Sequence, residues 1–379
     1  MNKKVYSKAF IYLVIVSIFL YSFLGPKGEL IENLEIPIGL GLDIEKKTEN
    51  DVSYITPIAA YLFETEEVDS EVMSGKASNI GGTREDRQLK VSRSFLLGLE
   101  RIFLISEQYA QYGIRNFIDI VMNNPEINDR SFVAISKEKS EDIFRHKIKG
   151  YANPSEFIEG LLKSSKQFNF FPDRQYTLMD ILVRVDAEGR NLLLPYIEIK
   201  DENIELTGLA VFKGDKMELK TNIEEAKIIN ILRENKVKGM LTIQDSSKKY
   251  INYYAESKRK VRCYKEDNKL KFSIDLSLNG PIVSNTLYLN LSTDPKVLKE
   301  FTKDMEKNLK ETYQTFINDK IKGEYKIDVL DLGRVAAAKY GREKNIDWNK
   351  VVSQSTIEVN VKVKVDTEGR GNYQLVPTK

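Results

Sequence analysis

The sequence predicts a multi-domain α+β protein, with mixed or antiparallel sheets flanked by helices, after an N-terminal membrane-anchor helix. Three observations predict this class. The chain has 379 residues, of which 41% are hydrophobic, and this is enough for two or three buried cores. Strand-like and helical segments alternate through two large regions, at residues 29–202 and 203–379. One long apolar run lies near the N-terminus, at residues 9–24.

Residues 1–28 have the pattern of a signal or membrane anchor. They hold four of the 58 basic residues and no acid, so the rest of the chain has 54 basic against 56 acidic residues. A basic start followed by an uncharged apolar run is typical of a secretory leader. At about 1.5 Å per residue the run extends about 24 Å, and extension back to Val5 with Lys8 snorkelling brings it to the roughly 30 Å of a bilayer core. A buried core helix is the less favoured alternative, because such helices seldom begin directly behind several lysines.

The predicted anchor residues are the apolar ones of this run. They are Ala9, Phe10, Ile11, Leu13, Val14, Ile15, Val16, Ile18, Phe19, Leu20, Phe23 and Leu24. A lipid-modified lipoprotein needs a Cys just after such a run, but the single cysteine of this chain is Cys263. Leu24 is also too bulky for a small-x-small cleavage site. We therefore expect an uncleaved, lipoprotein-like anchor that holds the body at the outer face of the membrane.

The first large region is expected to mix strands and helices. Strands are expected at residues 34–44, 52–63, 101–105, 131–136, 177–185 and 192–199. Helices are expected at residues 84–99, 107–112, 115–123, 140–147 and 154–168, the last capped by Asn153. The Ser- and Gly-rich stretch at residues 70–83 is expected to be a mobile loop.

The second large region is expected to combine strands with one long helix. Strands are expected at residues 204–212, 253–264, 270–278 and 357–365, with a hairpin turn around residues 266–268. A shorter helix is expected at residues 223–233. Asp294 is expected to cap the long helix, which runs toward Ile321 and carries one continuous apolar stripe. We expect this stripe to pack on the region's own sheet rather than on a partner.

The composition excludes several classes of chemical site. One Cys and one His exclude disulfides, multi-cysteine clusters and multi-histidine metal centres. The sequence has no G-x-S-x-G nucleophile elbow and no phosphate-binding P-loop. His146 is interpreted as a solvated surface residue, and the basic patch at residues 258–262 as the wet face of a strand. No catalytic, cofactor-binding or metal-binding residue is therefore predicted, and the balanced charge speaks against a nucleic-acid partner.

Four segments and one tryptophan carry a more specific pattern. Residues 39–43 (GLGLD) end an expected strand, and residues 104–114 (LISEQYAQYGI) pass from a strand into a helix. Residues 206–217 (LTGLAVFKGDKM) precede an acidic helix start, and residues 328–333 (DVLDLG) precede Trp348 and the last alternating strand. In this order, from about residue 30 to residue 373, they resemble the Ger(x)C family, the C subunit of the nutrient germinant receptors of endospore-forming bacteria.

The resemblance implies a receptor subunit without enzymatic activity and without a cofactor. It implies a place on the outer face of the cytoplasmic membrane, which is the inner membrane of the spore, and two membrane-embedded partners, the A and B subunits. The chain would act with these partners so that binding of a small-molecule nutrient triggers ion release and germination. Members of the family usually carry a Cys at the end of the leader, and this chain departs from them there. The family-motif residues, expected to be structural, are Gly41, Asp43, Gly113, Gly208, Phe212, Gly333 and Trp348.

Two other functional classes stay open on the sequence. A membrane-tethered extracytoplasmic solute-binding protein would have two lobes around a cleft and measurable affinity for a small molecule. A carboxylate-dependent cell-wall hydrolase would need only two acids that are distant in sequence. With 56 acids in the chain, the sequence does not single out such a pair. The identity of the nutrient, and whether this chain contacts it, are not encoded in any motif.

Overall fold

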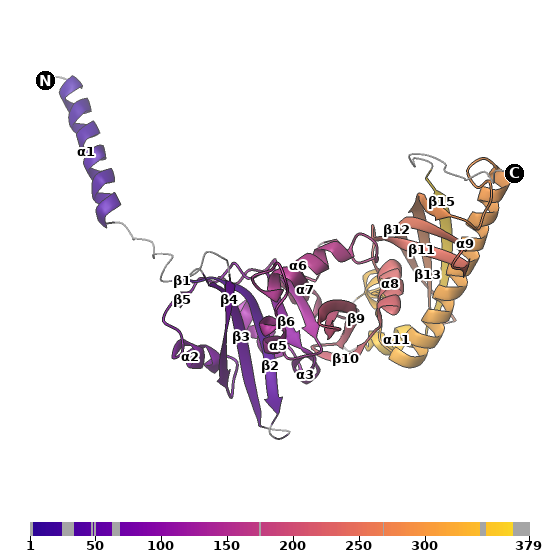
Figure 1. Ribbon diagram of the computed structural model, residues 1–379, viewed down its shortest axis with the longest axis horizontal. Coiled ribbons are helices and arrows are strands. Elements are labelled where there is room, and N and C mark those ends of the chain that lie inside the picture. The colour runs from indigo at the N-terminus through magenta and orange to yellow at the C-terminus, as the bar shows by residue number, and fades with distance from the viewer. Residues whose placement is uncertain are drawn as a thin grey trace.

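Two sheets dominate the computed structural model (Figure 1), which describes residues 3–24, 34–46, 48, 51–62, 69–173, 176–267, 269–341 and 346–366. One sheet has eight strands and the other has five. A third, two-stranded parallel pair joins β1 (Leu34–Glu35) to β5 (Ser94–Phe95). The family-motif residues lie on two strands of the eight-stranded sheet and in or next to three helices, so that sheet is described first.

Helix α1 (Lys3–Leu24) contains the apolar run. From Phe10 to Leu24 its side chains are exposed, and the rings of Phe19 and Phe23 contact each other in a tilted arrangement at a centroid distance of 5.1 Å. The side chain of Ala9, a predicted anchor residue, lies outside the described part of the chain. Within the described residues, none of the helices combines the length and the hydropathy needed to cross a membrane.

The eight-stranded sheet has the order β10-β9-β8-β7-β6-β2-β3-β4. Its strands are β2 (Pro37–Lys46), β3 (Val52–Leu62), β4 (Asp69–Ala77), β6 (Ile102–Ser106), β7 (Phe132–Ser136), β8 (Leu193–Lys200), β9 (Asn203–Lys213) and β10 (Lys216–Lys220). The four central strands β8, β7, β6 and β2 are parallel, and the outer strands are antiparallel. Five of the six strands expected in the first region are thereby confirmed.

Helices cover both faces of this sheet. One face carries α5 (Ser140–Arg145) and α6 (Pro154–Ser165), and the other carries α3 (Glu107–Tyr112), α4 (Arg115–Met122), α7 (Leu178–Arg184) and α8 (Ile223–Arg233). Alternate residues of β6 therefore enter two different cores, Ile102 and Leu104 on the α6 side, and Phe103 and Ile105 on the α3 side. Burial on both faces explains why β6 is a continuous apolar run in the sequence.

The prediction of a mobile loop at residues 70–83 is wrong. This stretch contains β4, which pairs with β3 from Tyr54↔Ala77 to Leu62↔Asp69, and the start of α2 (Gly82–Gln88). Strand β4 lies at the edge of the sheet, so its polar side chains stay exposed and hide the apolar alternation. The helix expected at residues 84–99 is correspondingly short and ends at Gln88.

The prediction of a strand at residues 177–185 is also wrong, because this segment is helix α7. Thr177 caps it: the Thr177 hydroxyl accepts from the Asp180 N–H, and the Asp180 carboxylate accepts from the Thr177 N–H at 3.1 Å. This capping box fixes the first turn. Leu178 and Ile181, three residues apart, are both buried. The β-branched residues of this segment favour a strand, but the capping box formed by Thr177 and Asp180 stabilises the start of a helix.

The five-stranded sheet has the order β11-β12-β13-β15, with β14 paired to β12. Its strands are β11 (Lys238–Ser246), β12 (Lys249–Glu266), β13 (Lys269–Gly280), β14 (Ile282–Asn285) and β15 (Thr356–Val365). The predicted hairpin is confirmed by the pairing of Glu266 with Lys269. The predicted last strand is confirmed too, and its odd-numbered residues from Ile357 to Val363 are buried while the even-numbered ones are exposed.

A long helix packs on this second sheet. Helix α9 (Pro295–Phe316) starts at Asp294, whose carboxylate accepts from the Lys296 N–H at 2.8 Å, and it continues as a π-helix, η2 (Ile317–Tyr325). Its buried stripe includes Phe301, Met305 and Leu309, so the predicted docking on the region's own sheet is confirmed. Helices α10 (Leu332–Tyr340) and α11 (Trp348–Gln354) complete the region.

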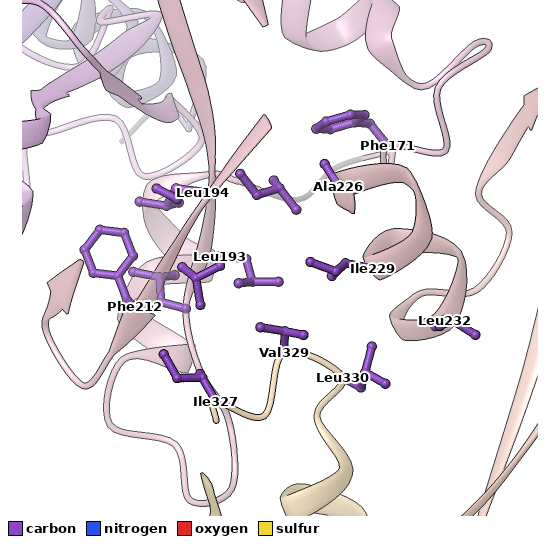
Figure 2. Close-up of a cluster of buried hydrophobic side chains, with 14 of the residues drawn as sticks. Phe171, Leu193, Leu194, Phe212, Ala226, Ile229, Leu232, Ile327, Val329 and Leu330 are labelled. Carbon is purple, nitrogen blue, oxygen red and sulfur yellow. The ribbon is translucent and has the colours of Figure 1, made fainter. Parts of the chain in front are cut away.

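The two sheets share one hydrophobic core. Strands β9 and β10 follow residue 203 in the sequence, yet they belong to the eight-stranded sheet. Figure 2 shows Leu193, Leu194 and Phe212 of this sheet facing helix α8 and the segment Ile327–Leu330, which lies between η2 and α10. The two-region division of the chain remains a prediction, and the shared core holds the two sheets together around α8.

Candidate functional site

Gly41 and Asp43 hold helix α5 on the first sheet. The Asp43 carboxylate accepts from the backbone N–H groups of Ser140 (2.8 Å) and Glu141 (3.1 Å), the first residues of α5. A Cβ on Gly41 would lie 2.2 Å from the Ser140 hydroxyl, so only glycine allows this approach. Burial raises the pKa of Asp43, although the hydrogen bonds from Ser140 and Glu141 favour the charged carboxylate. Two residues of one motif therefore fix one helix start.

Gly113 joins two motif segments that are far apart in the sequence. It ends α3 with φ +129°, a conformation that a residue with a side chain rarely adopts. The N–H of the next residue, Ile114, donates to the carbonyl of Asp215 at 2.9 Å. Asp215 lies in the turn between β9 and β10, so the segments at residues 104–114 and 206–217 touch there.

Helix α8 packs next to Gly208 and Phe212 of β9. A Cβ on Gly208 would lie 1.9 Å from the carbonyl oxygen of Thr221, which immediately precedes the cap of α8. The Thr221 hydroxyl accepts from the N–H of Leu209 at 3.0 Å. Phe212 is fully buried in the core that α8 faces (Figure 2). The close approach that Gly208 permits therefore sets the position of α8.

Gly333 and Trp348 meet at the start of α10. A Cβ on Gly333 would lie 2.8 Å from the Cβ of Trp348 and 3.1 Å from the Cα of Gly189, in the loop that leads to β8. The Arg334 N–H donates to the Gly189 carbonyl at 2.8 Å, and the Trp348 indole N–H donates to Glu188 at 3.2 Å. Two motif residues of the second region are thereby packed against the first sheet.

A buried polar cluster lies next to this contact, and we call it the junction cluster. It consists of Asn191, Arg233 and Asp328, which are buried, and of Arg259 and Asp331, which are partly buried. Arg233, at the end of α8, forms an ion pair with Asp331 at 3.1 Å and donates to the carbonyls of Val329 and Asn191, both at 3.1 Å. Burial alone would lower the pKa of Arg233, but Asp331 and Glu234 outweigh it and raise the pKa. The guanidinium thus stays charged and ties the end of α8 to the loop before β8 and to the segment that precedes α10.

Asp328 organises the backbone of its own motif. Its carboxylate accepts from the N–H groups of Leu330 (3.1 Å) and Gly333 (2.7 Å), and its backbone carbonyl accepts from the Asn191 amide at 3.0 Å. Burial raises the pKa of Asp328 to about 6, although the hydrogen bond from the Gly333 N–H opposes this shift. Residues 328–333 therefore form a compact turn that presents Asp331 to Arg233.

Arg259 does not fit the interpretation of residues 258–262 as the solvent-exposed face of a strand. Its guanidinium donates to the carbonyl of Leu330 at 2.8 Å and to that of Arg233. Burial lowers its pKa to about 10. Lys258, Lys260 and Arg262 are exposed, as that interpretation expects. Side chains alternate between the two faces of a strand, so Arg259 lies on the face of β12 opposite to Lys258 and Lys260, and this face is next to the junction cluster.

The single His and the single Cys do not join a catalytic arrangement in the described residues. His146 is half-buried, and its Nε2 lies 2.8 Å from the carbonyl oxygen of Glu202. Cys263 is buried in β12, and burial raises the pKa of its thiol. Among the residues that the structure describes, no group of three or more His, Cys, Asp or Glu side chains could hold a metal ion. The ion pair and hydrogen bonds of the junction cluster, in turn, connect helices, strands and loops to one another.

Sequence reasoning missed most of the junction cluster. Its five residues come from four separate segments, and charged residues are interpreted as solvated unless a partner is known. One signal was present: residues 328–333 stood out as a motif, and two of its acids are the cluster's carboxylates. The partners Arg233 and Arg259 could be found only once the helix and the strand that carry them were placed.

Replacing Asp43 with alanine is expected to lower the free energy of unfolding by about 2 kcal/mol, because two N–H groups at the start of α5 lose their acceptor. Urea unfolding followed by the fluorescence of Trp348, the single tryptophan, measures this. Asp142→Ala is the matched control, because Asp142 is exposed in the same first turn. Equal effects of the two substitutions would contradict the capping role of Asp43.

The stability contributed by Asp328 is expected to depend on pH. A carboxyl with a folded-state pKa of about 6 and an ordinary unfolded-state pKa near 3.9 binds protons more readily when folded. Its contribution therefore falls as pH rises from about 4 to about 6 and is constant above that. Relative to Asp328→Asn, the unmodified chain should gain roughly 2 to 3 kcal/mol on acidification through this window. A difference that stays constant from pH 7 to pH 4 would show that the folded state does not raise this pKa.

The comparisons with known proteins cover nearly the whole chain. Residues 27–199 match the family model described as "Spore germination protein N-terminal domain", and residues 207–369 match "Spore germination B3/GerAC like, C-terminal". The chain is 24% identical over 287 residues to the spore germination protein GerQC of Bacillus cereus, which covers 74% of this chain and 77% of that protein. A crystal structure of the GerBC protein has the same fold, with a TM-score of 0.55 at 15% identity, over 90% of this chain and 99% of the other. The chain therefore belongs to the Ger(x)C family of spore germination proteins, the family of GerAC and GerBC.

Proposed function

We propose that this protein is a non-catalytic, membrane-anchored subunit of a nutrient germinant receptor, required for spore germination in response to small-molecule nutrients. The observation that carries the proposal is the match of both halves of the chain, in order, to the two spore germination domains. The junction cluster supports the proposal, because its residues hold helices and loops next to the shared core of the two sheets.

Helix α1 supports a location at the membrane. Its exposed side chains are large and apolar, with Phe10 at 68%, Ile18 at 64% and Leu24 at 80% exposure. Such a surface is unfavourable in water, at about 25 cal/mol for each Å² of apolar area. The lysines that precede it carry the charge that favours an anionic membrane surface. In the proposal, α1 inserts in the cytoplasmic membrane, which is the spore's inner membrane, and the body lies on its outer face.

The proposed partners are the A and B subunits of the receptor, which are membrane proteins. Because the two sheets share one hydrophobic core, the subunit can move as one rigid body, and a displacement at one partner then reaches the other. The Arg233–Asp331 ion pair and the α8 contacts supply this locking. In the proposal, the chain acts by holding its partners in a competent arrangement, and not by transforming the nutrient.

Deletion of the gene tests this role. Spores without the protein are expected to form in normal number and to germinate slowly or not at all with a particular set of nutrients, measured as the fall in optical density of a spore suspension. The full-length chain should restore germination. A chain with Ile15→Lys and Phe19→Lys should not, because two charges in α1 oppose insertion. Normal germination of the deletion strain with every nutrient would refute the proposed role.

A further inference from the structure

The two edges of the five-stranded sheet differ. The outer edge of β15 is closed by side chains of α9: the Gln314 amide donates to the Ile357 carbonyl at 2.8 Å and accepts from the Val359 N–H at 3.2 Å. Glu306 accepts from the Val363 N–H at 2.9 Å. Because these backbone groups are occupied within the chain, this edge cannot pair with another strand.

The edge formed by β11 is closed only over its first residues. The Phe170 N–H donates to the Lys238 carbonyl at 2.8 Å, and the Met240 N–H donates to the Phe168 carbonyl at 3.1 Å. Backbone groups alternate along a strand, so the N–H and C=O groups of Thr242 point to this same outer side. Beyond Met240, β12 is the one strand that pairs with β11 among the described residues, and Thr242 is exposed.

An acidic and apolar groove lies beside this open edge. It has a volume of about 550 Å³ and lies between β11, the segment that follows β14, and α9. Ile243, Leu287 and Val297 supply apolar surface, and Asp245, Glu300 and Asp304 supply carboxylates, while no Lys or Arg of the described chain lines it.

The three carboxylates face one phenol. The Tyr288 hydroxyl donates to Asp304 at 2.8 Å. Burial raises the pKa of Tyr288, and the charges of Asp304, Glu300 and Asp245 raise it further. The groove therefore concentrates negative charge next to apolar surface, which is the complement of an extended segment that carries both basic and apolar side chains on one face.

We propose that the edge of β11 and this groove bind an extended segment of a partner polypeptide by strand addition. Every second residue of the segment faces the groove, and these residues include both Lys or Arg and apolar side chains. The backbone of the segment pairs with Thr242, and its alternate side chains enter the groove. The register shift between Gln244 and Ser246 ends the regular edge, so the added strand is short and the groove provides the remaining contacts. This surface goes beyond the proposed receptor role and rests on none of its assumptions.

A displayed library of random short peptides, selected on the full-length chain in detergent, tests the proposal. The selected peptides are expected to carry both Lys or Arg and apolar residues at every second position, because these side chains share one face of a strand. Their affinity is measured by fluorescence anisotropy with two pairs of variants. Thr242→Pro removes the outward N–H and should weaken binding at least about tenfold, whereas Thr242→Ala keeps the N–H and should retain it. Glu300→Lys should weaken binding similarly, whereas Glu311→Lys, at an exposed position of α9 outside the groove, should not.

Three results would overturn the proposal. The library could yield no peptide that binds the unmodified chain. The selected peptides could bind the Thr242→Pro and Thr242→Ala chains equally, while both variants melt at the temperature of the unmodified chain. The full-length chain could form a dimer that Thr242→Pro abolishes, and this would make a second copy the occupant of the edge.

Discussion

Replacing Gly208 with alanine is expected to lower the free energy of unfolding by about 3 kcal/mol, as overpacking of a tight backbone contact does. The new Cβ would lie 1.9 Å from the Thr221 carbonyl oxygen, so either β9 or the start of α8 must move. Movement of α8 draws Ala226, Ile229 and Leu232 away from the core in Figure 2. It also withdraws Arg233 from Asp331, so that a small change on the first sheet disturbs the junction cluster.

Urea unfolding monitored by the fluorescence of Trp348 measures this effect. Gly160→Ala is the control, because Gly160 is exposed within α6 and a Cβ there meets no atom within 4 Å. This control should stabilise the chain by about 0.5 to 1 kcal/mol, since alanine restricts the unfolded chain and favours helix. A Gly208→Ala chain as stable as the unmodified one would show that the close approach of Thr221 is not required.

Replacing Arg233 with methionine is expected to cost about 3 to 5 kcal/mol, the usual effect of removing one partner from a buried ion pair. Asp331 would lose the nearer of its two arginine partners and keep Arg190 at 3.8 Å, and the carbonyls of Val329 and Asn191 would lose a donor. Chemical denaturation of the full-length chain measures the loss. The destabilised chain should also restore germination poorly, because the junction cluster no longer supports the shared core of the two sheets.

Two further variants separate the ion pair from a general effect of losing an arginine. Arg262→Met should cost less than about 1 kcal/mol, because the pair between Arg262 and Asp275 is exposed to solvent. Adding Asp331→Asn to Arg233→Met should recover part of the stability, since the buried charge is then removed. Asn tolerates the left-handed conformation that Asp331 adopts, with φ 54°. If the double variant is less stable than Arg233→Met, then the charge of Asp331 does not destabilise the folded chain in the absence of Arg233.

The sequence predicts those elements whose apolar pattern has one clear period. Strand β15 alternates strictly, helix α9 has a continuous stripe, and α8 has a cap and acids in its first turn, and all three lie where the sequence places them. The errors concern segments in which the pattern is ambiguous. Edge strand β4 is too polar to show its period, and α7 is too short, at seven residues, to distinguish a helix from a strand.

The candidate site was predictable only in part, for a physical reason. Glycines in motifs such as Gly208 and Gly333 indicate close approach or unusual backbone, but they do not tell which segment approaches. The contacts that define the junction cluster join residues as distant as Asn191 and Asp328, where the Asn191 amide donates to the Asp328 carbonyl at 3.0 Å. Such contacts follow from the packing of two sheets around α8, which no local pattern encodes.

The central claim is that this chain works as one subunit of a membrane-bound germinant receptor. The most direct measurement is copurification: the full-length chain, carrying an affinity tag at its C-terminus, is isolated from detergent-solubilised spore membranes and its companions are identified by mass spectrometry. We expect the A and B subunits of a germinant receptor in the membrane fraction, in fixed proportion to the chain. Recovery of the chain in the soluble fraction, alone or with the permease of a solute transporter, would contradict the claim.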